Sequence, residues 1–68
     1  MSINILVNGR PMAVREGLTV EQLLAELRVR RDYTAVALNR QITARSGYAT
    51  TVLQDGDRVE IVHPMAGG

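Results

Sequence analysis

The dipeptide Asn8-Gly9 stands between two strand-like segments near the start of the chain. Both residues tolerate positive φ, and an Asn-Gly pair in this setting is the strongest short-range signal of a β-hairpin. The first segment, Ile3–Val7, is rich in β-branched residues, and Met12–Arg15 can return as the second strand. Pro11 cannot donate a ladder hydrogen bond, so we expect the second strand at a sheet edge.

A single amphipathic helix is predicted after this hairpin. Thr19 is a good N-cap, and Gln22 three residues later completes a capping box. The apolar residues that follow recur at helical spacing and form one stripe: Val20, Leu23, Leu24 and Leu27. The pattern stops near Arg28, and Arg30 and Arg31 follow it. A basic contact patch would explain these charges, but a solvated helix end is the more ordinary interpretation.

Two strand-like segments come next. Ala35–Asn39 predicts a buried strand, Arg40-Gln41 a polar turn, and Ile42–Arg45 a short strand. The segment that follows shows no periodic pattern, and we expect Tyr48 and Leu53 to anchor it to the core.

The last strand is predicted over Arg58–His63, after a tight turn at Asp55-Gly56-Asp57. The central glycine can take positive φ, and two carboxylates around a glycine are more typical of a turn than of a metal site. Val59 and Ile61 are expected to face the core. His63 could be a general base or a metal ligand, but a lone histidine at a strand end is more often structural or solvated.

The order of elements is therefore β-β-α-β-(β)-β in a chain of 68 residues, which has room for one small domain. An early hairpin, one main helix and a late strand predict an α+β fold of the β-grasp (ubiquitin-like) type. Its mixed four- to five-stranded sheet would pack on the helix. We assign residues 1–63 to this domain and residues 64–68 to a flexible C-terminal tail.

The chain ends on Pro64-Met65-Ala66-Gly67-Gly68. Glycine lacks Cβ, so backbone at Gly67 and Gly68 can pass through a slot that excludes other residues. Five extended residues reach about 16–18 Å. A narrow tail that ends in a carboxylate suits insertion into another protein's active site, with Met65 as an adaptable apolar contact. The ordinary alternative is a frayed terminus.

Composition excludes several classes of function. The chain has no cysteine, which removes disulfides, thiolate metal sites, iron–sulfur clusters and thiol nucleophiles. A net charge of +1 and two tyrosines as the only aromatic residues give no case for a nucleic-acid partner. No apolar run is long enough to cross a bilayer and no secretory leader opens the sequence, so we expect a cytoplasmic protein with no membrane partner. All eight basic residues are arginine, so the chain offers no lysine for self-conjugation.

With these elements in place, the chain resembles the ThiS family of sulfur carriers in thiamine biosynthesis, over nearly its whole length. The segments that carry the likeness are Val36–Asn39 with Ile42 and Arg45, Gln54–Asp57 with the strand after it, and Ala66-Gly67-Gly68. Two departures are visible: Ala44 stands where the family often has proline, and Tyr48 where tryptophan is common. Both lie away from the tail.

The resemblance implies a protein co-substrate rather than an enzyme, with no cofactor of its own. A ThiF/MoeB-like adenylating enzyme would use ATP and Mg²⁺ to adenylate the Gly68 carboxylate. A sulfur donor, such as a cysteine desulfurase or a rhodanese-like protein, would convert the adenylate to a thiocarboxylate. A ThiG-like thiazole synthase would take this sulfur into the thiazole ring. Gly68 is then the modified residue, while Pro64, Met65, Ala66 and Gly67 contact partners, and the carrier alone is expected to be a monomer.

Two other functions stay open. A MoaD-like carrier has the same fold, tail and adenylation chemistry but serves molybdopterin synthesis, and related carriers serve tungsten-cofactor, cysteine or siderophore pathways. The short chain favours ThiS, because MoaD-like chains tend to be longer. A β-grasp binding module with an incidental tail belongs to a different class. Residues added after Gly68 should abolish the function of a carrier and hardly affect a binding module.

Overall fold

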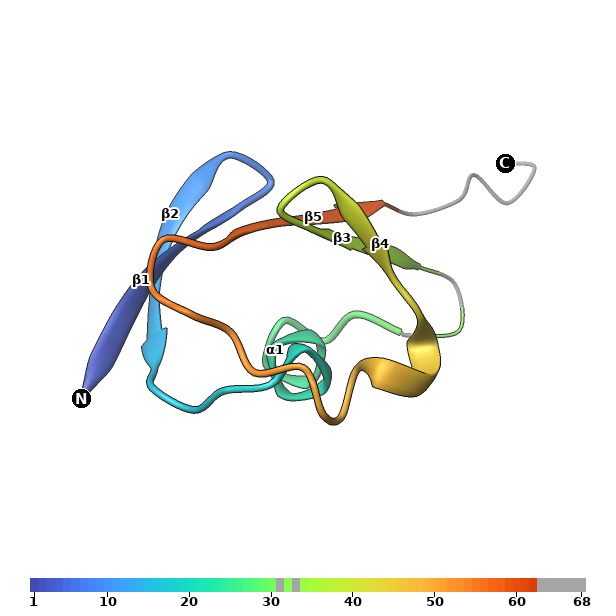
Figure 1. Ribbon diagram of the computed structural model, residues 1–68, viewed down its shortest axis with the longest axis horizontal. Coiled ribbons are helices and arrows are strands. Elements are labelled where there is room, and N and C mark those ends of the chain that lie inside the picture. Colours follow the sequence, from blue (N-terminus) through green and yellow to red (C-terminus); the bar gives the residue numbers. More distant parts are fainter. Residues whose placement is uncertain (31, 33, 63–68) are drawn as a thin grey trace.

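The computed structural model describes residues 1–30, 32 and 34–62, and the statements below concern these residues. Five strands form one sheet in the spatial order β2-β1-β5-β3-β4 (Figure 1). Their bounds are β1 (Ser2–Val7), β2 (Arg10–Arg15), β3 (Ala35–Leu38), β4 (Gln41–Thr43) and β5 (Arg58–Val62). β1 and β5 run parallel, and the other three neighbouring pairs are antiparallel. The sheet is therefore mixed, as the β-grasp prediction requires.

The hairpin of β1 and β2 forms where Asn8-Gly9 predicted it. Asn8 has φ 51° and Gly9 has φ 83°, so both residues of the two-residue loop occupy the left-handed region. Val7 pairs with Arg10, so β2 begins two residues before the predicted Met12. β2 lies at the edge of the sheet, which confirms the expectation from Pro11.

The hairpin of β3 and β4 differs in register from the prediction. Leu38 pairs with Gln41, so the turn is Asn39-Arg40 and Gln41 belongs to the strand. Asn39 (φ 52°) and Arg40 (φ 69°) are both left-handed, which matches the twist of the flanking strands in a two-residue loop. The prediction that the strand reaches Arg45 is also wrong, because β4 ends at Thr43. Arg45 instead begins a short 3-10 helix, η2 (Arg45–Gly47).

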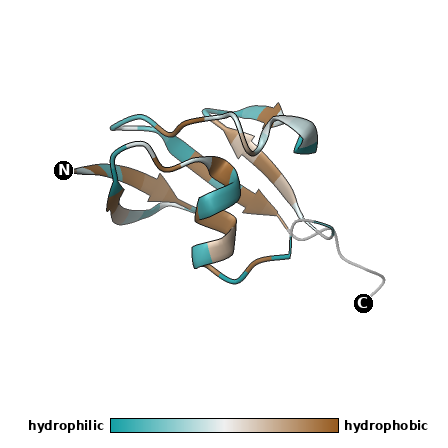
Figure 2. Ribbon diagram, turned by 90° about the horizontal axis from the view of Figure 1, so that it is seen from below, coloured by the Kyte–Doolittle hydropathy of each residue, from teal (hydrophilic) through white to brown (hydrophobic). Residues whose placement is uncertain are grey.

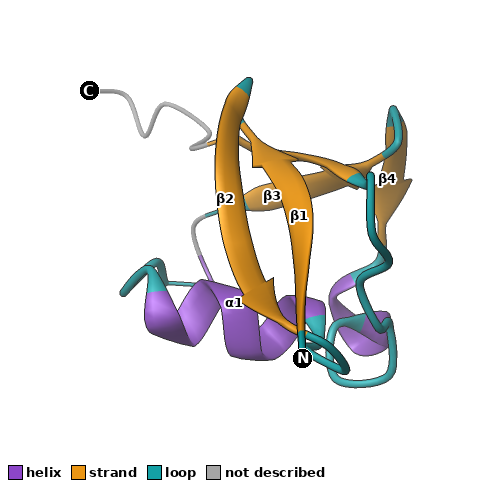
Figure 3. Cartoon of the chain, turned by 90° about the vertical axis from the view of Figure 1, so that its left-hand side faces the viewer, coloured by secondary structure: helices purple, strands orange, loops and turns teal. Residues whose placement is uncertain are grey.

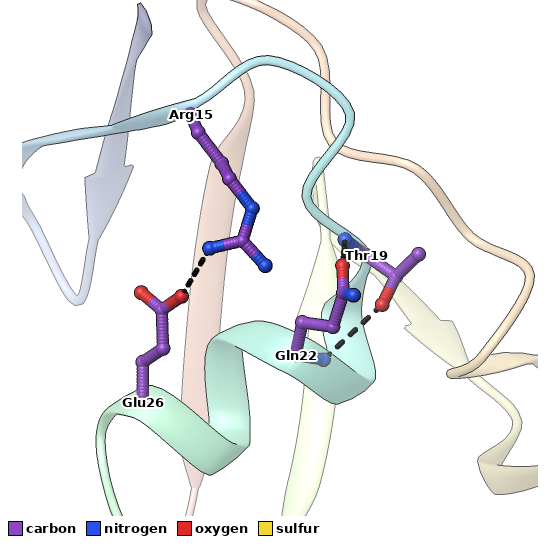
Figure 4. A network of polar contacts seen from close by, with 4 residues as sticks. All are labelled: Arg15, Thr19, Gln22 and Glu26. Carbon is purple, nitrogen blue, oxygen red and sulfur yellow. Dashed lines mark hydrogen bonds and ion pairs between the residues drawn. The ribbon is translucent and has the colours of Figure 1, made fainter.

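The capping box predicts the start of the helix correctly. α1 (Val20–Glu26) begins after Thr19, whose Oγ1 accepts a hydrogen bond from the Gln22 backbone N–H at 3.1 Å (Figure 4). The Gln22 Oε1 in turn accepts from the Thr19 N–H at 3.0 Å. Two orphan donors of the first turn are satisfied in this way.

The helix ends in a Schellman motif that the sequence does not predict, because no glycine stands at the end of the helix. The Val29 N–H donates to the Leu24 carbonyl at 2.9 Å, and the Arg28 N–H donates to the Ala25 carbonyl at 3.1 Å. Arg28 occupies the left-handed position of the motif, with φ 58°, where glycine is usual. The motif folds the chain back, so that Val29 packs against the core beside the end of α1.

The core fills the space between the sheet and α1, which lies against one face of it (Figure 3). Viewed from the helix side, the strands behind α1 are largely apolar, while α1 itself carries both polar and apolar residues (Figure 2). Tyr48 and Leu53 are 1% and 2% exposed, which confirms them as anchors of their segment. The buried apolar residues are Ile5, Val14, Leu18, Val20, Leu23, Leu24, Val36, Tyr48, Leu53, Val59 and Ile61.

Candidate functional site

The predicted site residues Pro64, Met65, Ala66, Gly67 and Gly68 lie outside the described residues, as do His63 and Arg31. The assignment of residues 64–68 to a flexible tail therefore stays a prediction. The described chain ends at Val62, the last residue of β5. The structure shows how residues 59–62 at the end of β5 are held by β3 and by Asn8, and we call this part of the sheet the platform.

Strand β5 is held along both of its edges at this platform. On one side it pairs with β3, with Val36 opposite Ile61 and Ala35 opposite Val62. On the other side the β1 ladder ends at Val7, which pairs with Val59. Asn8 continues the hydrogen bonds along this edge of β5. Its N–H donates to the Val59 carbonyl at 2.8 Å, and its side-chain Oδ1 accepts from the Ile61 N–H at 2.8 Å. An asparagine side chain thus extends the sheet where β1 has already turned away.

The start of β5 is fixed by a second asparagine, in the β3–β4 turn. The Asn39 N–H donates to the Arg58 carbonyl at 2.7 Å, and its Oδ1 accepts from the Arg58 N–H at 2.9 Å. Its Nδ2 donates to Asp57 Oδ1 at 3.1 Å. The sequence patterns identified Asn8 as a turn residue but placed Asn39 in the preceding strand. They missed both side-chain bonds, because the bonding partners are 53 and 19 residues away in sequence.

The Asp55-Gly56-Asp57 segment forms the predicted turn, with Gly56 at φ 88°. The Asp55 Oδ1 accepts from the Asn4 N–H at 2.8 Å, and the Asp57 Oδ2 accepts from the Gln54 N–H at 2.8 Å. Both carboxylates therefore bond within the fold, which supports the turn interpretation over the metal site. Within residues 1–30, 32 and 34–62, no cluster of three or more His, Cys, Asp or Glu could hold a metal ion.

The outer face of the sheet, turned away from α1, carries two exposed apolar side chains near this platform. Val59 and Ile61 of β5 are buried, so Val62 lies on the opposite face and is 55% exposed. Ile42 of β4 is 75% exposed. The pairings of Ala35 with Val62 and of Ala37 with Ile42 place small side chains beside both of them. We call Ala35, Ala37, Ile42 and Val62 the outer patch.

A groove of about 650 Å³ opens on the face of the sheet that α1 covers, between the β1–β2 hairpin and the end of α1. We call it the hairpin groove. Its lining is mostly apolar and consists of Val7, Pro11, Met12, Leu27, Val29 and Ile61, with Asn8 and Arg10 as the polar members. The sequence does not predict this groove, because it forms where the β1–β2 hairpin, the Schellman turn after α1 and strand β5 meet, and these are distant in the chain.

The basic residues after α1 do not form a described cluster. Arg28 and Arg30 are exposed and follow the end of the helix, as predicted, while Arg31 is outside the described residues. No helix in the part of the chain that the structure describes is long and apolar enough to cross a membrane.

Comparison with known proteins identifies the family. The ThiS family model matches residues 5–68. The sulfur carrier protein ThiS of Escherichia coli is 38% identical over 66 residues, which are 97% of this chain and all of that protein. The crystal structure of the thiamine biosynthesis protein ThiS from Geobacter metallireducens superposes with a TM-score of 0.85 at 39% identity, covering 97% of this chain and 100% of that one.

A second kind of relative is much longer. A thiazole synthase of Magnetococcus marinus is 36% identical over 66 residues, which cover 97% of this chain but 20% of that protein. A segment like this chain therefore forms part of a longer polypeptide there. The full-length matches decide the assignment and confirm the resemblance seen in the sequence: the chain belongs to the ThiS family, and it is a sulfur carrier rather than a catalyst.

Proposed function

We propose that this carrier delivers sulfur as a thiocarboxylate on Gly68 to thiazole synthase, for the thiazole ring of thiamine. The observation that carries the proposal is the extent of the family match, which runs through Gly68 and so includes the Gly67-Gly68 end. The thiazole synthases that contain a segment like this chain support the choice of acceptor. Cytoplasmic location and a monomeric free carrier belong to the same proposal.

The chemistry begins with activation of the C-terminus. A carboxylate is anionic at neutral pH and a poor electrophile, so it needs a better leaving group. A carboxylate oxygen attacks the α-phosphorus of ATP, pyrophosphate leaves with Mg²⁺, and an acyl-adenylate forms. Hydrosulfide, or a sulfur donor that supplies it, then attacks the acyl carbon; the bond to AMP breaks and the thiocarboxylate remains. A ThiF/MoeB-like enzyme provides the ATP site, and the carrier provides the reacting terminus.

The described residues support this division of labour. In this proposal the adenylating enzyme supplies the catalysis and the carrier presents its terminus. β5 leads directly into residues 63–68 and is bonded up to Val62 on its β3 edge and up to Ile61 on its other edge. Exposed Ile42 and Val62 of the outer patch lie at the same end, where a partner that accepts Pro64, Met65, Ala66 and Gly67 would contact the sheet. Apolar side chains of this exposure suit protein contacts.

The test is reconstitution with intact-mass measurement. The purified carrier is incubated with its adenylating enzyme, ATP, Mg²⁺ and sulfide, and we expect a gain that matches replacement of one oxygen by sulfur, mapped to Gly68. Thiazole synthase and a molybdopterin synthase are then offered the charged carrier separately, and we expect only thiazole synthase to discharge it. An unchanged mass, with an adenylating enzyme that charges a known carrier, would refute the proposal and favour the binding module. Discharge by the molybdopterin synthase alone would favour the MoaD-like alternative.

A further inference from the structure

We propose that the hairpin groove is a docking site for thiazole synthase, and that it receives a segment in which a large apolar side chain lies next to carboxylates. The inference rests on the proposed function, because it concerns the partner that takes the sulfur. It adds a surface on the helix side of β5, separate from the outer patch on the opposite face of the sheet.

The size and lining of the groove fit a side chain of a partner protein. Its volume of about 650 Å³ falls in the usual range for binding sites, and such sites are mostly apolar with a few placed polar groups. The Schellman motif holds one wall in place, because its bond from the Val29 N–H to the Leu24 carbonyl fixes where Val29 lies. Met12 and Leu27 are half-buried and pack against the core, so the opposite walls are also supported from behind.

The polar side chains that line the groove, Asn8 and Arg10, offer hydrogen-bond donors to a ligand. The Asn8 Oδ1 is already occupied by the Ile61 N–H, which leaves its Nδ2 as a donor. Arg10 lines the groove and is exposed, and its guanidinium has no hydrogen bond or ion pair among the described residues. Among the residues that the structure describes, no carboxylate lines the groove. An apolar wall bordered by free donors and a cation is complementary to an apolar side chain with carboxylates beside it.

The position of the groove favours thiazole synthase as the occupant. Ile61 lines the groove and stands directly before Val62, where the described chain ends, so a protein that receives the C-terminus lies close to it. In two bacteria a segment like this chain is part of a thiazole synthase polypeptide. A tethered pair has a high effective concentration, which makes a direct contact between the two bodies easy to maintain. The outer patch stays available to the adenylating enzyme.

The test measures binding of the uncharged carrier to purified thiazole synthase by titration calorimetry at low salt. Arg10→Glu should raise the dissociation constant at least about tenfold, and the difference should shrink as salt is added. The matched control is Arg40→Glu, which makes the same change of charge at an exposed arginine that does not line the groove. Val29→Thr, which keeps the shape but places a hydroxyl in the wall, should weaken binding about threefold. Circular dichroism verifies that all variants are folded.

Equal dissociation constants for Arg10→Glu and Arg40→Glu would overturn the inference while leaving the proposed function intact. Tighter binding after deletion of residues 63–68 would also overturn it, because the groove would then be covered by this chain's own terminus. Concentration-dependent dimerisation that Arg10→Glu abolishes would assign the groove to a second copy instead. Failure of the unaltered carrier to bind thiazole synthase at all would count against the proposed function itself.

Discussion

Replacing Asn8 tests how the platform under the C-terminus is held. Asn8 has two roles that a substitution can separate: it occupies a left-handed conformation with φ 51°, and its Oδ1 accepts the Ile61 N–H at 2.8 Å. Asn8→Asp keeps an acceptor and tolerates the left-handed region. Asn8→Gly keeps the backbone freedom but removes the acceptor, and Asn8→Ala loses both.

The expected magnitudes follow from burial. Ile61 is 7% exposed and its bond to Asn8 is partly buried, and a buried N–H that loses its partner costs about 1–3 kcal/mol. We expect Asn8→Gly to lower the free energy of unfolding by about 1.5–2 kcal/mol, within that range. Asn8→Ala should lower it by about 3 kcal/mol, because a left-handed alanine adds about 1 kcal/mol. Asn8→Asp should stay within about 0.5 kcal/mol of the unaltered protein.

Equilibrium urea unfolding followed by circular dichroism measures these differences. In a domain of this size 1 kcal/mol corresponds to about 4–8 °C in Tm, so thermal unfolding should place Asn8→Gly about 6–16 °C below the unaltered protein. Amide hydrogen exchange should show lost protection at Ile61 in the Gly and Ala variants. If Asn8→Gly and Asn8→Asp unfold with the same free energy, the side-chain bond contributes nothing and the reasoning is wrong.

Three further changes test other parts of the molecule. Gly67→Val should leave thermal unfolding unchanged yet block adenylation measured by intact mass, because Cβ would obstruct the narrow path proposed for the terminus; normal adenylation would refute that path. Arg28→Gly should raise the free energy of unfolding in urea by about 0.5–1 kcal/mol, since glycine suits the left-handed Schellman position, and a loss would contradict this. Glu26→Gln should change it by less than about 0.5 kcal/mol, because the 2.7 Å ion pair with Arg15 is half-exposed (Figure 4); a loss above about 1 kcal/mol would show that solvent screens the pair less than expected.

The features that the sequence predicts are those encoded by neighbouring residues. Asn8-Gly9, the Thr19–Gln22 capping box and the Asp-Gly-Asp turn each act within a few residues, and each forms as expected. The predicted β3–β4 turn, Arg40-Gln41, lies one residue late, because the prediction assigns Asn39 to the strand although Asn39, at φ 52°, is a residue type that tolerates the left-handed region. The Schellman motif is not predicted, because its left-handed residue is Arg28 and not glycine. Local backbone bonding, the Schellman bonds around Arg28 and the Leu38–Gln41 pairing around Arg40, holds each exposed arginine in a conformation that favours glycine.

Less of the candidate site than of the fold could be predicted from the sequence. The Gly67-Gly68 end could be recognised from residue types alone, and the family match includes it. The platform could not be recognised, because Asn8 bonds across 53 residues. The hairpin groove could not be recognised either, because it joins β1, β2, β5 and the end of α1. No periodicity or short motif indicates that the side chains of Asn8 and Asn39 each accept a distant backbone N–H.

The stiffness of β5 bears on how tightly partners can bind the terminus. Ordering the backbone of one residue costs about 1–2 kcal/mol. Binding of the terminus in a partner's active site includes this cost for every residue that becomes ordered on binding. Because Ile61 and Val62 are held by Asn8 and by β3, neither of these two residues adds to that cost. Loosening both residues would therefore weaken partner binding by tenfold or more, since about 1.4 kcal/mol is a factor of ten in affinity. Asn8→Gly releases only the Ile61 N–H, while Ile61 and Val62 stay paired with β3, so it should raise the KM of adenylation for the carrier by less than tenfold. It should leave kcat unchanged, because the reacting carboxylate is the same once bound. A fall in kcat at unchanged KM would show instead that Asn8 matters to the chemistry and not to presentation of the terminus.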